Sequence, residues 1–162
     1  MNEVWRIIPE FPNYSVSDLG RVRNDEMGYI MTQLRNQHGV VHVGLTRNLV
    51  QYRRSVALIV ASAFVPKLNE HFDTPIHLDG DRFNSEVENL MWRPKWFAAR
   101  YHQQFKNGER GFKVPVLDTK TGERFKTSWE AALKYGLIDR EILVATTNRT
   151  YVWPTYQVFR VI

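Results

Sequence analysis

The chain has 162 residues, a formal net charge of +5 and a sequence pI of about 9.6, which together favour an anionic partner such as nucleic acid. It contains no cysteine, which excludes disulfides and thiolate zinc sites and is typical of a reducing cytoplasm. The N-terminal residues lack the pattern of a signal peptide, and no stretch is apolar enough to span a bilayer. We therefore expect a cytoplasmic protein without a membrane partner.

The first informative stretch, Val4–Asn24, predicts short strands joined by turns. Trp5, Ile7 and Ile8 suit a short strand, which Pro9 and Pro12 are expected to interrupt, and alternation over Tyr14–Ser17 indicates another strand. A further strand begins at Arg21, and side chains two residues apart on a strand share a face. Arg21 and Arg23 could therefore contact phosphates together, or they could be the solvated charges that protect an edge strand from aggregation.

Residues 27–54 continue as short strands and add three arginines to the basic surface: Arg47, Arg53 and Arg54. The apolar run Ser55–Phe64 predicts a buried helix that ends before Pro66.

The stretch Ile76–Trp92 is a polar, turn-rich hairpin with one histidine, His77, at the end of its first strand. Asp79-Gly80 is a strong turn signal, and Asn89 leads into the apolar second strand. The residues that follow, Lys95–His102, have the spacing of a helix. Two strands around a loop, followed by a helix, with a histidine at the first strand end, are the ground plan of a one-metal nuclease site.

The segment 103–113 is polar and contains two glycines, which indicates a linker before a separate C-terminal unit. Strands are predicted at 114–118 and 123–125, on either side of a turn. A closing aromatic strand is expected to include Trp153, Tyr156 and Phe159.

Between these strands the sequence predicts a helix, a glycine turn and a second helix. The first helix, Ser128–Tyr135, has a capping box of Thr127 and Glu130, and Gly136 ends it. Asp139 is expected to cap the second helix, which runs to Thr146. If this helix-turn-helix reads DNA, three side chains of its second helix and the residues after it could meet phosphates and base edges: Arg140, Asn148 and Arg149.

Three parts of the chain resemble modules of the HNH homing endonucleases of phages and introns. The nuclease-associated domain that often precedes HNH motifs is matched by Trp5, Ile8-Pro9, Tyr14, Val16-Ser17 and Gly20-Arg21-Val22. The HNH motif is matched, without a gap, by His77, Asp79-Gly80, Asn84, Asn89, Leu90 and Trp92. The C-terminal modular DNA-binding repeat of these enzymes resembles residues 114–162.

The resemblance implies that His77 is the general base that activates water and that Asn89 braces the loop. In the family, the residue before the histidine and one on the following helix bind a divalent cation. These positions fall on Ile76 and on or near Ala98, whose side chains have no ligating atom.

We therefore expect a lost metal site in preference to a shifted one. In a shifted site, Asp79 and His102 are the leading substitute ligands, and Asp81 or Asp73 could also approach from the loop. No cofactor is expected unless the site is active, in which case it would be Mg²⁺ or another divalent cation.

The expected fold class is α+β. It would combine a short-strand N-terminal module, a central ββα-metal (HNH-like) hairpin and helix, and a C-terminal strand pair with a helix-turn-helix. The corresponding domains are residues 1–54, 55–102 and 114–162, with 103–113 as a linker.

Three functions stay open. The first is a nucleic-acid-binding protein derived from an HNH homing endonuclease whose DNA cleavage is lost or weakened. The second is an active, metal-dependent DNA-nicking endonuclease with substitute ligands. The third is a binder of structured RNA or of a ribosome-like assembly. The inherited DNA-reading module favours double-stranded DNA as the partner, and the resemblance implies a monomer encoded by a phage and acting in bacterial cytoplasm.

Overall fold

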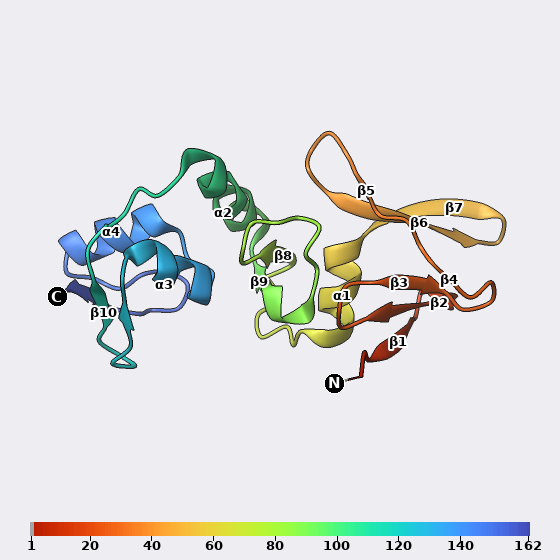
Figure 1. The fold of residues 1–162 in the computed structure, drawn as a ribbon, viewed down its shortest axis with the longest axis horizontal. Helices are drawn as coiled ribbons and strands as arrows, with labels where there is room; N and C mark the ends of the chain where they lie inside the picture. The colour runs from red at the N-terminus through yellow and green to blue at the C-terminus, as the bar shows by residue number, and fades with distance from the viewer. Residues whose placement is uncertain (1) are drawn as a thin grey trace. The chain divides into compact units, whose positions relative to one another are not determined.

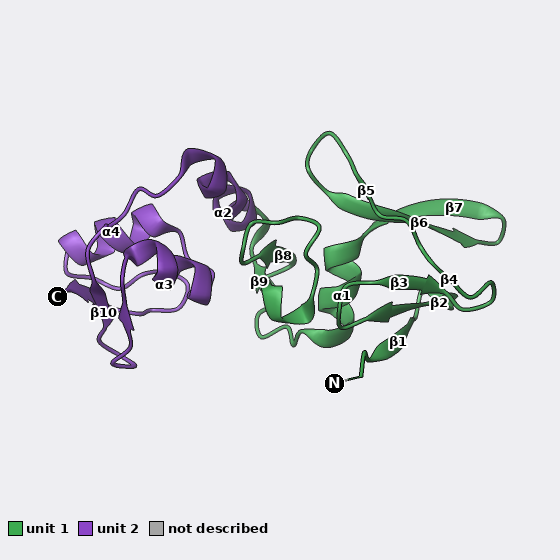
Figure 2. Ribbon diagram, in the orientation of Figure 1, with its two compact units in different colours: residues 1–95 green, residues 96–162 purple. Residues whose placement is uncertain are grey.

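A computed structural model describes residues 2–162, and the chain forms two compact units, Met1–Lys95 and Trp96–Ile162 (Figures 1 and 2). Small antiparallel sheets and short helices make up both units, which confirms the α+β class expected from the sequence. No helix within the described range combines the length and the apolarity that crossing a membrane requires.

The first sheet of unit 1 is antiparallel, in the order β1-β2-β3-β4. Its strands are β1 (Trp5–Ile8), β2 (Phe11–Ser17), β3 (Val22–Asn24) and β4 (Tyr29–Ile30). As expected, β1 ends at Ile8, directly before Pro9, whereas Pro12 lies inside β2 and does not interrupt a strand. Ile7 pairs with Ser15 but Ile8 pairs with Phe11, so the register shifts here. Pro12 falls in the skipped part of this register, where β1 requires no N–H donor.

The second sheet has the order β5-β6-β7, with β5 (Leu34–Arg35), β6 (Val41–Arg47) and β7 (Val50–Ser55). Helix α1 (Val56–Phe64) follows β7 directly and begins where Ser55 Oγ accepts a hydrogen bond from the Leu58 amide at 3.3 Å. The predicted buried helix is confirmed, because Val56 and Val60 are fully buried.

A third element of unit 1 is the hairpin of β8 (Thr74–His77) and β9 (Leu90–Arg93), with the short 3-10 helix η1 (Val87–Asn89) between them. Leu90 and Trp92 of β9 belong to the same hydrophobic core as both sheets and α1. The core therefore anchors the ends of the hairpin, and the loop 78–89 is held between two fixed strands.

Unit 2 contains nearly all of α2 (Lys95–Asn107) and a sheet in the order β11-β10-β12. Its other elements are β10 (Val116–Asp118), β11 (Arg124–Phe125), α3 (Ser128–Tyr135), α4 (Asp139–Thr147) and β12 (Phe159–Val161). Only Phe159 of the predicted closing strand lies in β12. Trp153 and Tyr156 lie in the turns before it, because Val152 already pairs with Gln157 there.

The boundaries of α3 follow the sequence prediction. Thr127 Oγ1 accepts a hydrogen bond from the Glu130 amide at 3.3 Å, and Gly136 ends the helix with a φ of 65°. The carboxylate of Glu130 accepts from the amide of Lys126, one residue before the one that a capping box requires. The glycine turn and the helix that follows it confirm the helix-turn-helix.

The start of α4 differs from the prediction. Ile138 is its N-cap, and Asp139 does not cap its own helix. The Asp139 carboxylate instead accepts hydrogen bonds from the amides of Arg110 and Gly111, at 2.9 and 2.8 Å, and from the Ser128 hydroxyl. Asp139 thus fastens the chain after α2 to the helix-turn-helix.

Helix α2 continues to Asn107, beyond the expected end at His102. Its buried Gln104 donates to the Leu137 carbonyl at 3.1 Å and accepts from the Asp139 amide at 3.0 Å. The predicted linker 103–113 is therefore partly helical and partly bonded to the C-terminal module, and the fourfold division of the chain stays a prediction.

Candidate functional site

The loop between β8 and β9 is organised around the side chains of Asp79 and Asn89. Asn89 Oδ1 accepts from the Asp79 amide at 3.0 Å, and Asn89 Nδ2 donates to Asp79 Oδ1 and to the Asn84 carbonyl, both at 2.8 Å. Asp79 also accepts from the Asp81 amide and from Asn84 Nδ2, both at 2.8 Å. Asn89 thus occupies the position of a loop brace.

Partial burial acts to raise the pKa of the Asp79 carboxyl, but the hydrogen bonds from Asn84, the Asp81 amide and Asn89 outweigh it. The pKa of Asp79 is therefore lower than its ordinary value, and the side chain is a carboxylate at neutral pH. Because the carboxylate accepts three hydrogen bonds within the loop, binding a cation would require it to give some of them up.

His77 lies at the end of β8 with only 3% of its surface exposed. Its Nε2 is 3.2 Å from the hydroxyl of Ser85, which is also buried. Burial, with a smaller effect from the positive charge of Arg82, lowers the pKa of His77 to about 4, although Asp79 and Asp81 act in the opposite direction. The imidazole is therefore neutral at pH 7, and it is a weaker base than an exposed histidine.

The metal position before His77 is filled by Ile76, which is fully buried and pairs with Met91 of β9. On α2, Ala98 is buried as well, and His102 lies one helical turn further along and is half-buried. Within residues 2–162, no three His, Asp or Glu side chains are grouped so that they could hold a metal ion. The donor set does not fit the oxygen-rich shell that Mg²⁺ requires, so no catalytic step can be derived through a metal.

Arg21 and Arg23 both lie against the ring of Trp5. Their guanidinium carbons are 5.5 and 4.1 Å from the centroid of its ring. Arg21 forms an ion pair with Glu3, whose pKa is lowered to about 2 by the hydrogen bonds from Arg21. Arg23 pairs with Asp25 at 2.8 Å. Both arginines are thus largely neutralised by neighbouring carboxylates.

Arg47 and Arg54 lie on the face of the second sheet that also carries Tyr52. Arg47 is 5.1 and 5.0 Å from the ring centroids of Phe11 and Tyr52, and Arg54 is 5.3 and 5.2 Å from the same two rings. Arg54 also forms an ion pair with Glu10 at 3.6 Å. Both guanidinium groups are held by aromatic rings, and Glu10 forms its ion pair with Arg54 and not with Arg47.

Arg53 points from the opposite face of β7, because side chains alternate along a strand. Cross-strand pairing places it beside Gly44, with Gln51 opposite Thr46 and His42 opposite Leu34 on the same face. No Asp or Glu occurs between Met27 and Asn69, so the whole sheet is free of carboxylates. The three arginines that the sequence assigned to the basic surface, Arg47, Arg53 and Arg54, all fall within this acid-free run.

In unit 2, Ile142 and Ala145 of α4 are buried in the core, and the opposite side of the helix is exposed. Arg140 and Asn148 lie on this exposed side, and Arg149 follows with a φ of 55°. The three predicted contact residues are therefore accessible in this unit.

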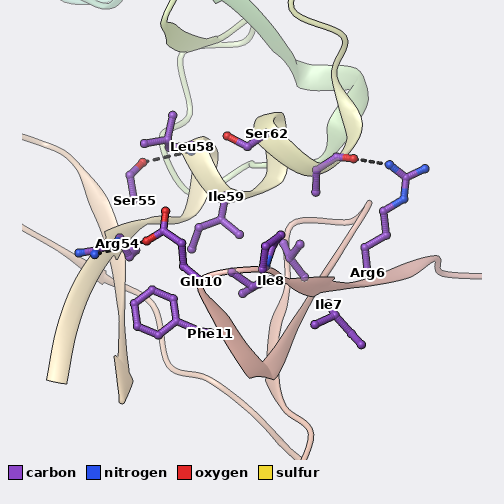
Figure 3. A pocket seen from close by; sticks show the side chains of 13 residues that line it. Arg6, Ile7, Ile8, Glu10, Phe11, Arg54, Ser55, Leu58, Ile59 and Ser62 are labelled. Atoms are coloured by element: carbon purple, nitrogen blue, oxygen red, sulfur yellow. Dashed lines mark hydrogen bonds and ion pairs between the residues drawn. The ribbon is translucent and has the colours of Figure 1, made fainter. Parts of the chain in front are cut away.

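A cleft of about 480 Å³ opens between the β1–β2 hairpin and α1 (Figure 3). The charged side chains at its rim are engaged with the protein itself. Arg6 donates to the Ala63 carbonyl at the end of α1, and Arg54 pairs with Glu10. Its lining includes no residue of the β8–β9 hairpin, so this cleft is not the counterpart of a nuclease site.

Comparison with known proteins finds a NUMOD4 motif at residues 3–46. Two uncharacterised HNH endonucleases of Acanthamoeba polyphaga mimivirus are 28% and 30% identical to the chain over 88 residues, or 54% of its length. The chain spans 26% of one of these relatives and 22% of the other, about a quarter of their length.

The chain is also similar to a solved structure of DNA binding and cleavage by the HNH homing endonuclease I-HmuI. The TM-score is 0.56, with 98% of each chain covered and 19% of residues identical. This likeness extends the shared fold over both units of the chain.

Proposed function

Because this chain belongs to the HNH homing endonuclease family, as its motifs predicted, we propose that it binds duplex DNA and that its metal-dependent cleavage is lost or severely weakened. The proposal rests on two side chains of the β8–β9 hairpin. Ile76 is fully buried at the first metal position, and the Asp79 carboxylate is committed to three hydrogen bonds within the loop. Without ligands for a cation, no bound positive charge can stabilise the negative charge that develops on the scissile phosphate during cleavage.

Binding would occur through the basic surfaces of both units. In unit 1 the acid-free sheet offers Arg47 and Arg53, and also Arg54 if Glu10 releases it. In unit 2 the exposed side of α4 offers Arg140 with Asn148 and Arg149. Arg21 and Arg23 are weaker contributors, because Glu3 and Asp25 would have to release them. Occupancy of a DNA site by a monomer, rather than cutting, would then be the activity.

The binding proposal is tested by titrating the protein against duplex DNA and folded RNA over a range of salt concentrations. Contact with several phosphates predicts a steep, linear fall of log K with log salt concentration, with tighter binding to DNA. Tighter binding to folded RNA would instead support the RNA-binding alternative. A flat salt dependence would contradict both.

The active-nuclease alternative requires Asp79 or His102 to bind the cation. Under that alternative, plasmid nicking would be abolished by Asp79→Ala or by His102→Ala. Nicking that survives both substitutions would eliminate these substitute ligands. A phage-encoded origin and a cytoplasmic setting stay predictions.

A further inference from the structure

The hairpin that joins β6 to β7 ends in a two-residue turn, Asn48-Leu49, between the paired residues Arg47 and Val50. Both turn residues have positive φ, 51° for Asn48 and 63° for Leu49. Such turns fit the twist of a hairpin, but they strongly favour Asn-Gly. The left-handed conformation costs a residue such as leucine about 1–2 kcal/mol, which glycine would avoid.

Leu49 gains no packing energy to offset this strain, because 99% of its surface is exposed. The next residue, Val50, is 51% exposed. The turn lies at the end of β7 opposite to α1, and the hairpin projects there from unit 1 (Figure 1). Leu49 thus combines a strained backbone conformation with an apolar side chain exposed to solvent, and neither feature stabilises the fold. Such features are expected where a residue serves a function.

The surroundings of the turn indicate what its partner must be. The hairpin lies within the acid-free run between Met27 and Asn69, and Arg47 is the residue just before the turn. The Arg47 guanidinium is fixed by Phe11 and Tyr52 and by a 3.1 Å hydrogen bond to the Glu10 carbonyl. The tip therefore presents an apolar side chain beside an immobilised positive charge. Duplex nucleic acid complements this pair of side chains, because its negatively charged phosphates lie outside and the apolar faces of its stacked base pairs lie inside.

We propose that Leu49 is an apolar wedge that inserts between stacked base pairs of duplex DNA while Arg47 contacts the phosphate beside the opened step. This inference rests on the proposed DNA binding and adds a mode of recognition to it. Pyrimidine–purine steps are the easiest to unstack, so the wedge would select sites by deformability rather than by hydrogen bonds to bases.

The test uses a duplex of alternating dA and dT, about two helical turns long, that carries 2-aminopurine at one TA step. Unstacking raises the fluorescence of 2-aminopurine. At saturating concentrations, the wild type and Leu49→Met, which keeps an apolar side chain, are expected to raise this fluorescence severalfold. Leu49→Gly is expected to lose the increase and to bind the duplex about tenfold more weakly.

Two controls separate the wedge from other effects. Leu68, which is 95% exposed in the same unit, supplies the matched variant Leu68→Gly, and this variant is expected to behave as the wild type. Leu49→Gly also removes backbone strain, so its thermal unfolding temperature is expected to rise, and weaker binding could not be ascribed to unfolding.

The outcomes distinguish the wedge from the binding function. If the wild type binds no duplex, the proposed function fails and the wedge fails with it. If the wild type binds but 2-aminopurine fluorescence is unchanged, or if Leu49→Gly retains the increase, the wedge alone is wrong. An increase that is larger with an alternating rA–rU duplex would overturn DNA as the partner of the tip.

Discussion

Asp79 and Asn89, ten positions apart in the chain, hold each other by two reciprocal hydrogen bonds: the Asp79 amide donates to Asn89 Oδ1 at 3.0 Å, and Asn89 Nδ2 donates to Asp79 Oδ1 at 2.8 Å. The pair closes the loop of the β8–β9 hairpin across its base. The Asp79 carboxylate, which the sequence suggested as a substitute metal ligand, thereby helps to maintain the loop.

This relationship predicts that Asn89→Ala lowers the free energy of unfolding by about 2–3 kcal/mol, because it leaves the Asp79 amide and the Asn84 carbonyl without their partner. Asn84→Ala, which removes one more exposed hydrogen bond to Asp79, is expected to cost about 1 kcal/mol. Urea denaturation measures both. Equal effects of the two substitutions would show that Asn89 is not the central brace.

Because His77 is buried, we expect the stability of the folded chain to decrease at acidic pH. Its pKa is about 4 in the folded chain, against an ordinary value of 6.5. Above pH 6.5 the imidazole is neutral in both the folded and the unfolded chain. As the pH falls below 6.5, the unfolded chain takes up the proton first, so stability decreases by about 3 kcal/mol and levels off below pH 4.

The change His77→Gln is expected to remove this part of the loss between pH 6.5 and 4. His38→Gln, at an exposed histidine, serves as the control and should keep it. Denaturation at several pH values measures the free energy of unfolding of both variants. An unchanged pH dependence in His77→Gln would mean that the imidazole titrates normally.

Gly111 lies where the chain after α2 is bonded to the helix-turn-helix, and we expect that a residue with a Cβ atom does not fit there. An added Cβ would lie 2.1 Å from Asp139 Oδ1 and 2.2 Å from Ser128 Oγ, two atoms that are hydrogen-bonded to each other and buried. Gly111→Ala should therefore destabilise the protein by about 2–4 kcal/mol in thermal or urea unfolding.

Gly44→Ala is the matched control, because its Cβ would meet only the flexible side chain of Gln51, at 2.6 Å. It should cost less than about 1 kcal/mol. If the two substitutions were equally tolerated, the Asp139 network would be more adaptable than its contacts indicate.

Arg53 predicts a change in the salt dependence of DNA binding. Arg53→Gln is expected to reduce the slope of log K against log salt concentration by about one phosphate contact, because its sheet face carries no carboxylate. Arg21→Gln should change the slope less, since Glu3 already neutralises Arg21. Fluorescence anisotropy titrations measure both slopes. The reverse order would identify the Trp5 cluster as the principal phosphate contact.

The sequence was sufficient wherever a structural feature depends on neighbouring residues. The caps of α3 at Thr127 and Gly136, the turn at Asp79-Gly80 and the buried run of α1 are all local patterns, and all are found. The family motif also singled out Asn89, whose role as the loop brace stays a prediction. These features are fixed by short-range chemistry that can be read along the chain.

Features built from distant residues were not predictable. Asp139 was expected to cap α4, but it bonds Gly111 28 positions earlier in the chain, and Gln104 bonds the Asp139 amide from 35 positions away. Likewise, the ion pair that neutralises Arg21 joins it to Glu3, 18 positions earlier in the chain. Charge counted along the sequence cannot reveal which arginines are already paired.

Loss of cleavage is tested most directly by the nicking of supercoiled plasmid in the presence of Mg²⁺ or Mn²⁺, with the wild type and His77→Ala compared at concentrations that saturate DNA binding. We expect that the wild type binds the plasmid and produces no metal-dependent nicks above those of His77→Ala. Metal-dependent nicking by the wild type that disappears in His77→Ala would contradict this expectation, because a working site would then exist despite Ile76 and Ala98.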